Sequence, residues 1–266
     1  MFTIKIYPIN FENCNLRTKL NKMTRLSVNI NKIATLRNSR GGNTPNVVQA
    51  AIDIQEFGAQ GITIHPRPDE RHIKYRDAYD LQPVITTEFN IEGNPIKKFV
   101  DLVLKIKPTQ VTLVPDAVDA ITSNAGWDTI VNQSFLTEVI AEFKKNGIRT
   151  SIFMDTNLSF IEAAAKTGAD RIELYTEEFA SQYELGNEKA IEPYIESANL
   201  AANLGLGINA GHDLSLTNIQ FFAQHIPNLL EVSIGHALIA ESLYLGLQNV
   251  INMYLYKLEN VQAANE

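Results

Sequence analysis

Cysteine is almost absent from this chain of 266 residues, in which Cys14 is the only one. A single cysteine excludes an internal disulfide and fits a reducing compartment, so we expect a cytoplasmic protein. Long apolar runs are also missing, and no uncharged stretch approaches the length of a transmembrane helix. Basic residues are not in excess either, because the net charge is −7. This balance argues against nucleic acid or an anionic membrane as a partner, so any phosphate must be bound locally by a few arginines and backbone amides.

Short β-branched segments alternate with amphipathic helical segments along the chain. This alternation implies a parallel sheet with right-handed crossovers, and eight repeats of it imply a closed (β/α)8 TIM barrel of the α/β class, a single domain with extra short helices. A doubly wound open sheet is the alternative. The eight predicted strands span residues 26–31, 61–65, 83–88, 110–114, 150–154, 171–175, 206–210 and 230–234.

Residues 1–23 precede the first predicted strand. Met1–Lys22 is rich in asparagine, lacks clear periodicity and has no small-residue cleavage site of a signal peptide. Met23 then leads directly into a strand. We therefore expect residues 1–23 to be an N-terminal extension outside the barrel, with the barrel domain in residues 24–266. A chain that starts at Met23 should fold and stay active.

Titratable residues gather where the predicted strands end. His65 follows a short apolar strand and is succeeded by Pro66 and Pro68, which cannot continue a central strand. Chemistry in such barrels sits at the C-terminal ends of the strands. We therefore expect a mouth that holds imidazoles, carboxylates and arginines together. The residues placed there are Asn29, His65, Arg67, His72, Glu88 at the end of strand three, Glu173 in the outer half of strand six, His212 and His236.

The loops after strands seven and eight are suited to anions. Gly211 and Gly235 allow the backbone to approach a ligand closely. His236 opens the last helix, where free amides and the helix dipole favour negative charge. The long loop 115–127 has the length of a lid.

Several other readings stay open at this point. The histidines could be structural, and histidines with carboxylates could hold a divalent metal, although no tight motif such as His-Glu-x-x-His is present. A Schiff-base aldolase needs a lysine that points into the mouth, and only Lys32 is placed for that role. A homologue that binds sugar phosphates without turnover is a third reading.

Five segments together resemble the pyridoxine 5′-phosphate synthase family over residues 24 to 258. They are Ser27–Gly41, Gly61–His72, Leu113–Pro115, Asn209–His212 and Ile234–Ala237. The resemblance implies a (β/α)8 barrel that forms homo-oligomers, specifically a homo-octamer, and needs no metal or organic cofactor. It also implies the joining of 1-deoxy-D-xylulose 5-phosphate to 3-amino-2-oxopropyl phosphate, with pyridine ring closure and release of phosphate and water.

The same resemblance assigns roles to individual residues. His65 and Glu88 would accept protons, His212 would donate one, and Glu173 would stabilise a transition state. The amino-ketone phosphate would be held by Asn29, Arg40, Gly235 and His236, and the deoxyxylulose phosphate by Arg67, His72 and Thr122.

Two positions depart from the common family pattern. Asn31-Lys32 stands where the family usually has an aspartate–histidine pair, and Asp213 stands where it has glycine after the donor histidine. Asn31 can still hydrogen-bond to a sugar hydroxyl group, and Lys32 can still donate to a phosphate or a hydroxyl group, but they cannot copy an Asp–His proton relay. Asp213 adds negative charge beside His212, which favours a protonated imidazole and opposes nearby phosphate.

Overall fold

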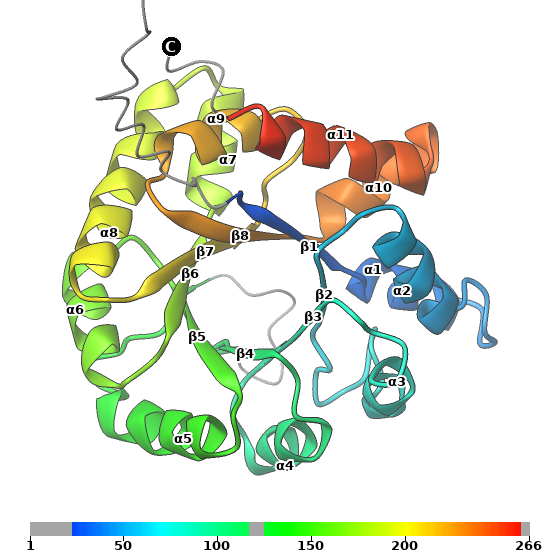
Figure 1. The fold of residues 1–266 in the computed structure, drawn as a ribbon, viewed down its shortest axis with the longest axis horizontal. Coiled ribbons are helices and arrows are strands. Elements are labelled where there is room, and N and C mark those ends of the chain that lie inside the picture. Colours follow the sequence, from blue (N-terminus) through cyan, green and yellow to red (C-terminus); the bar gives the residue numbers. More distant parts are fainter. Residues whose placement is uncertain (1–22, 117–124, 262–266) are drawn as a thin grey trace, which may run out of the picture.

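Eight parallel strands close into a barrel in the computed structural model, which describes residues 23–116 and 125–261. The strands follow one another around the barrel in chain order, and β1 pairs with β8 to close it (Figure 1). This closure confirms the predicted TIM barrel and excludes a doubly wound open sheet. The strands are β1 (Arg25–Asn29), β2 (Gly61–Ile64), β3 (Glu88–Gly93), β4 (Gln110–Leu113), β5 (Arg149–Met154), β6 (Arg171–Tyr175), β7 (Gly207–His212) and β8 (Leu229–Ile234).

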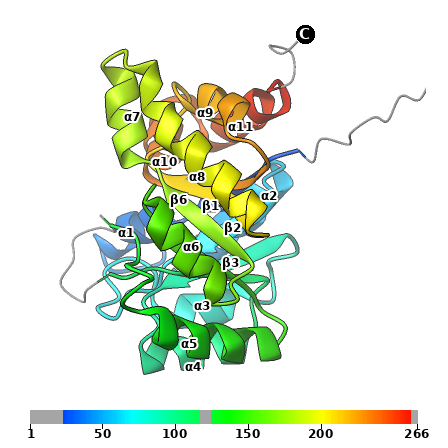
Figure 2. The same ribbon diagram turned by 90° about the vertical axis from the view of Figure 1, so that its left-hand side faces the viewer.

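Helices surround the barrel on the outside (Figures 1 and 2). The predicted last helix is two helices, because Gly246 adopts a φ of +84° between them. Two helices were not predicted, α1 and α7. The full set is α1 (Asn31–Asn38), α2 (Val47–Glu56), α3 (Tyr75–Leu81), α4 (Lys97–Ile106), α5 (Gln133–Lys145), α6 (Leu158–Lys166), α7 (Glu177–Glu184), the 3-10 helix η1 (Glu188–Ile191), α8 (Glu192–Asn203), α9 (Ile219–His225), α10 (His236–Leu245) and α11 (Leu247–Glu259).

The hydrophobic core lies between the strands and the helices, whereas the inside of the barrel is polar. Successive side chains of a strand point to opposite faces. In β3, Phe89 and Ile91 belong to the hydrophobic core, and Asn90 between them hydrogen-bonds to Thr63 and Thr112 across the interior. Strands of this barrel therefore alternate apolar and polar residues, although both faces are buried.

The prediction that strand three ends at Glu88 is wrong, because β3 begins there. The backbone amide of Glu88 donates to the carbonyl oxygen of Gln60 and starts the pairing with β2. The preceding amides of Thr86 and Thr87 donate to the side chain of Gln55 instead of to a neighbouring strand. Glu88 consequently lies at the N-terminal end of the barrel, opposite the expected mouth.

The carboxylate of Glu88 forms ion pairs with Arg25 of β1 and Arg149 of β5. Further along this network, Arg171 lies 3.4 Å from Glu231. These pairs link strands on several sides of the barrel at its N-terminal end. The arrangement assigns Glu88 to the closure of the barrel.

Some predictions fall on residues outside the described part of the chain. They concern the N-terminal extension as far as residue 22, and Thr122 with most of its loop. Among the helices that are described, none combines the length and the apolar character needed to cross a membrane.

Candidate active site

The parallel strands bring distant residues to one rim of the barrel. Asn29 ends β1, His65 directly follows β2, and His212 ends β7. Gly235 follows β8 and caps α10. Because all strands run in the same direction, these positions share the C-terminal rim, where barrel enzymes carry their active sites. The two histidines predicted to meet at one mouth therefore lie on the same rim.

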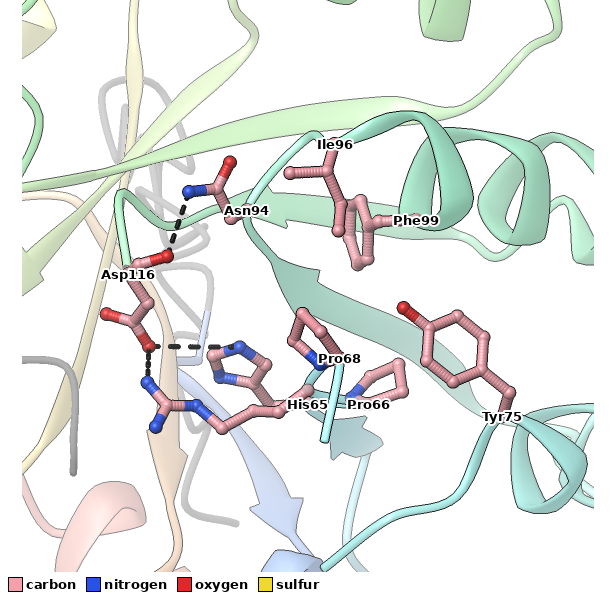
Figure 3. A pocket seen from close by; sticks show the side chains of 9 residues that line it. His65, Pro66, Pro68, Tyr75, Asn94, Ile96, Phe99 and Asp116 are labelled. Carbon is pink, nitrogen blue, oxygen red and sulfur yellow. Dashed lines mark hydrogen bonds and ion pairs between the residues drawn. The ribbon is translucent and has the colours of Figure 1, made fainter. Parts of the chain in front are cut away.

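His65 is a buried imidazole beside an ion pair. Figure 3 shows the carboxylate of Asp116, which follows β4, beside the imidazole of His65. The guanidinium of Arg67 pairs with the Asp116 carboxylate, whose Oδ2 lies 3.9 Å from Nε2 of His65. Burial, reinforced by the charge of Arg67, lowers the pKa of His65 to about 3. The imidazole is therefore neutral at neutral pH and can accept a proton.

His72 lies against His65, with the ring centroids 6.1 Å apart. Its Nδ1 accepts a hydrogen bond from the backbone amide of Ile73 at 3.0 Å. Burial, followed by the charges of His65 and Arg67, lowers the pKa of His72 to about 3. A neutral ring whose Nδ1 is an acceptor carries its proton on Nε2, so His72 can donate a hydrogen bond to an anionic oxygen.

The residues after β1 connect the first two strands. The side-chain oxygen of Asn31 accepts a hydrogen bond from the backbone amide of His65 at 2.9 Å. The backbone amide of Asn31 donates to the side-chain oxygen of Asn29 at 3.0 Å. Asn31 therefore fixes the backbone that carries the imidazole. Lys32 lies exposed in the first turn of α1, outside the barrel interior, and its charge contributes to the lowered pKa of His72.

Two carboxyl groups, those of Glu92 and Glu173, lie inside the barrel. Glu92 of β3 accepts a hydrogen bond from Nδ2 of Asn29 at 3.4 Å, and Oε2 of Glu173 of β6 lies 3.3 Å from Oγ1 of Thr112, within hydrogen-bond distance. Burial, followed by the charge of Glu173, raises the pKa of Glu92 well above its usual range. Burial, followed by the charge of Glu231, raises the pKa of Glu173 to about 8.

Glu92 and Asp116 are the site residues that the sequence reasoning missed. Glu92 lies near the C-terminal end of β3, where the misplaced strand had put Glu88. Asp116 lies three residues beyond the end of β4, directly after Val-Pro, as Arg67 lies three residues beyond the end of β2. The position after each strand was the available signal for Asp116, and the alternation Glu88-Phe-Asn-Ile-Glu92 was the signal for Glu92.

His212 is held in an unusual backbone conformation. Its φ of +95° lies in the left-handed region, which a residue with a side chain adopts only when its surroundings impose it. Nδ1 of His212 pairs with the carboxylate of Asp213, and the ring lies edge-on to Tyr175 with centroids 5.0 Å apart. The imidazole is thereby oriented at the rim with a carboxylate behind it.

The N-terminus of α10 offers backbone amides to an anion. Gly235 caps this helix of ten residues and packs against the side chain of Asn29. His236 is exposed in the first turn. Arg40 is also exposed, two residues beyond α1, and lies outside the hydrogen-bonded cluster around His65.

Metal ligands do not cluster in residues 23–116 and 125–261. No group of three or more His, Cys, Asp or Glu side chains there is arranged to hold a metal ion. The chemical groups that this rim does assemble are a neutral imidazole, an imidazole–carboxylate pair and carboxyl groups with raised pKa values. Among them, the carboxyl group of Glu173, with its pKa of about 8, titrates near neutral pH, which is the range that acid–base catalysis uses.

The fold and the rim together define a (β/α)8 barrel that gathers titratable groups at the C-terminal ends of its strands, as barrel enzymes do. The sequence places it more narrowly: the model of the family described as pyridoxal phosphate biosynthesis protein PdxJ matches residues 26–260. The chain belongs to this family.

Curated relatives are similar to almost the whole chain. A pyridoxine 5′-phosphate synthase of Flavobacterium johnsoniae is 72% identical over 237 residues, which cover 89% of this chain and 100% of the relative. A protein of the same name from Christiangramia forsetii is 66% identical and covers 88% of this chain and 98% of the relative.

Solved structures with low sequence identity share the barrel. The structure of phosphoribosyl anthranilate isomerase from Thermotoga maritima aligns with 90% of this chain over 100% of its own length, with a TM-score of 0.58 at 14% identity. The 3-keto-L-gulonate-6-phosphate decarboxylase of Vibrio cholerae covers 90% of this chain and 99% of its own, with a TM-score of 0.62 at 9% identity. At these identities the similarity supports the fold alone.

Proposed function

We propose that the protein is a pyridoxine 5′-phosphate synthase. It condenses 1-deoxy-D-xylulose 5-phosphate with 3-amino-2-oxopropyl phosphate, closes the pyridine ring and releases phosphate and water. The observation that carries this proposal is the membership in the family, with relatives of that name up to 72% identical over 89% of the chain. The rim chemistry supports it, because imine formation and dehydration need a base, an acid and anion-binding groups in one place.

The proton acceptors in this proposal are the neutral imidazole of His65 and the ionised form of Glu92. The lowered pKa of His65 keeps a free lone pair on the ring at neutral pH. Glu92 replaces Glu88 in the role first assigned to the carboxylate of strand three, because only Glu92 lies at the mouth. His212, backed by Asp213, is the proton donor, and Glu173 stabilises the transition state from within the barrel.

The phosphate groups would occupy two parts of the rim. Asn29, Gly235 and the first amides of α10 form one part, to which Arg40 and His236 can bring further donors from the surface. Arg67 and His72 form the other part beside His65. Asn31 supports the second part by holding the backbone of His65.

The proposal is tested by supplying the purified protein with both substrates and following pyridoxine 5′-phosphate by chromatography and absorbance. We expect product without added metal and after treatment with a chelator. Trapping of a substrate on Lys32 by borohydride without product would support a Schiff-base aldolase. Binding of both substrates without product would support a homologue that has lost turnover.

We also propose that the protein is a homo-oligomer, as the resemblance implies with a homo-octamer. Large apolar side chains that are exposed in the monomer support this proposal. They lie on α10 and α11: Leu243, Tyr244, Leu245, Met253 and Tyr256. Light scattering coupled to size-exclusion chromatography measures the mass directly, and a monomeric mass at micromolar concentration would contradict the proposal.

A further inference from the structure

A chain of hydrogen bonds crosses the inside of the barrel and ends at Glu173. Oγ of Ser27 lies 2.7 Å from Oγ1 of Thr63, which accepts from Nδ2 of Asn90 at 3.4 Å. Oγ1 of Thr112 lies 3.1 Å from Oδ1 of Asn90 and 3.3 Å from Oε2 of Glu173. All five side chains are buried, with no more than 2% exposed. They come from β1, β2, β3, β4 and β6, so the chain joins most of the barrel wall.

The hydroxyl of Thr112 has one proton and two neighbours that could accept it. Oδ1 of Asn90 can only accept, and the other end of that amide is already directed at Thr63. If Thr112 donated to an ionised Glu173, the buried carbonyl of Asn90 would lose its donor. If Thr112 donates to Asn90, its lone pairs face Glu173, and the carboxyl group must supply the proton of that contact.

We propose that Thr112 and Asn90 are positioning residues that keep the proton on Glu173. In this arrangement Glu173 donates to Thr112, Thr112 donates to Asn90, and Asn90 donates to Thr63. The carboxyl group of Glu173, the hydroxyl group of Thr112 and the side-chain amide of Asn90 then each donate to an acceptor, which is the arrangement that buried polar groups require. The catalytic consequence rests on the proposed function: Glu173 enters the reaction as a neutral carboxylic acid that can donate a hydrogen bond.

The charged groups around Glu173 act in the same direction. Glu231 of β8 and Glu92 of β3 are both carboxyl groups that face it from other strands. Arg171, two residues earlier in β6, bonds to Glu231 and Asn209 at the N-terminal side. Burial and the charge of Glu231 raise the pKa of Glu173, and the hydrogen bond between Thr112 and the ionised carboxylate lowers it by a smaller amount.

The direction in which Thr112→Val shifts the pKa of Glu173 decides between the two proton arrangements. We would titrate the Glu173 carboxyl group in the substrate-free protein by infrared difference spectroscopy, with Glu173→Gln to identify its band. In Thr112→Val the protonated acid loses its acceptor, so its pKa should fall by about one pH unit. Thr112→Ser, which keeps the hydroxyl, should restore the wild-type titration. A rise in the pKa in Thr112→Val would overturn the proposal, because it would mean that Thr112 donates to the carboxylate.

A second variant keeps the test decisive if Thr112→Val does not fold. In Asn90→Leu the proton of Thr112 becomes free to bond to the carboxylate, so the pKa of Glu173 should again fall. An unchanged or raised pKa would contradict the proposal.

Turnover gives a readout that loss of packing alone would not produce. The alkaline limb of kcat against pH should move to lower pH in Thr112→Val by the amount that the titration shows, while KM stays near its wild-type value. The titration needs no substrate. If the protein is an active synthase but the pKa of Glu173 rises in Thr112→Val, only this inference is refuted. If the pKa falls as expected but the protein forms no product, only the proposed function is refuted.

Discussion

Gly211 of β7 leaves room for the carboxyl group of Glu173 on the neighbouring strand: a Cβ atom at position 211 would lie 2.6 Å from Oε1 of Glu173. The same Cβ would lie 2.9 Å from the carbonyl oxygen of Ser233. Neither contact is sterically allowed, so a side chain here would displace the carboxyl group, the strand or both. The absence of a side chain at 211 is therefore a condition for the position of Glu173.

We expect Gly211→Ala to lower kcat at least tenfold and to destabilise the protein by about 1–3 kcal/mol, as overpacking in a core does. Gly168→Ala is a suitable control. That glycine has a φ of +80° but open space around it, so an alanine there should reduce stability without changing kcat. Steady-state kinetics and urea unfolding of both variants check the prediction. Equal losses of kcat in the two variants would show that the effect is not specific to Glu173.

The buried His65 makes the stability of the protein depend on pH. Its pKa of about 3 in the folded protein lies below the ordinary value of 6.5, which applies to the unfolded chain. Between these values the unfolded chain binds the extra proton, so the contribution of His65 to the free energy of unfolding falls as pH falls below about 6.5. For one such histidine the loss between pH 7 and pH 5 is about 2 kcal/mol.

His65→Asn should remove that part of the pH dependence, because asparagine does not titrate. Urea unfolding of both proteins at pH 7 and pH 5 measures it, and the wild-type protein should lose more stability on acidification than the variant does. Turnover of His65→Asn at pH 7 should fall at least a hundredfold, the usual contribution of a positioned proton acceptor. Identical losses of stability in the two proteins would contradict a neutral, buried imidazole.

Gly235 should affect one substrate more than the other. A Cβ atom at this position would lie 3.2 Å from Cβ and 3.3 Å from Cγ of Asn29. Gly235→Ala should therefore push Asn29 out of position and crowd the first amides of α10. We expect a several-fold rise in KM for 3-amino-2-oxopropyl phosphate, with KM for the deoxyxylulose phosphate as the internal control. An equal rise for both substrates would contradict the division of the rim into two anion-binding parts.

The sequence predicted the barrel well because short segments rich in β-branched and other apolar residues alternate with helical segments along the chain. For β6 the predicted and observed residues are the same, 171–175, and β2 differs by one residue at its end. In both strands isoleucine or leucine alternates with other residues, and β6 keeps this pattern although it contains Arg171 and Glu173. The helices α1 and α7 were missed. Their mostly polar sequences, such as Glu177-Glu-Phe-Ala-Ser-Gln-Tyr-Glu184, lack a clear apolar stripe.

The prediction failed at β3 because the inside of this barrel is polar. Glu88, Asn90 and Glu92 alternate with Phe89 and Ile91, which is the pattern of a strand with one face in water. Val84-Ile-Thr-Thr87 just before it is β-branched and was the more attractive choice, although the structure holds it as a loop through Gln55. The shift moved the predicted carboxylate by four residues, from one end of the barrel to the other.

The most direct test of this account compares two glutamates of the same strand, Glu92 at the mouth and Glu88 at the opposite end. The measurement is the rate of pyridoxine 5′-phosphate formation by Glu92→Gln and Glu88→Gln at saturating concentrations of both substrates. We predict that Glu92→Gln lowers kcat by a hundredfold or more. Glu88→Gln should keep kcat within a few-fold of wild type while it weakens the ion pairs with Arg25 and Arg149. Near-normal turnover in Glu92→Gln, or its loss in a folded Glu88→Gln protein, would contradict the account.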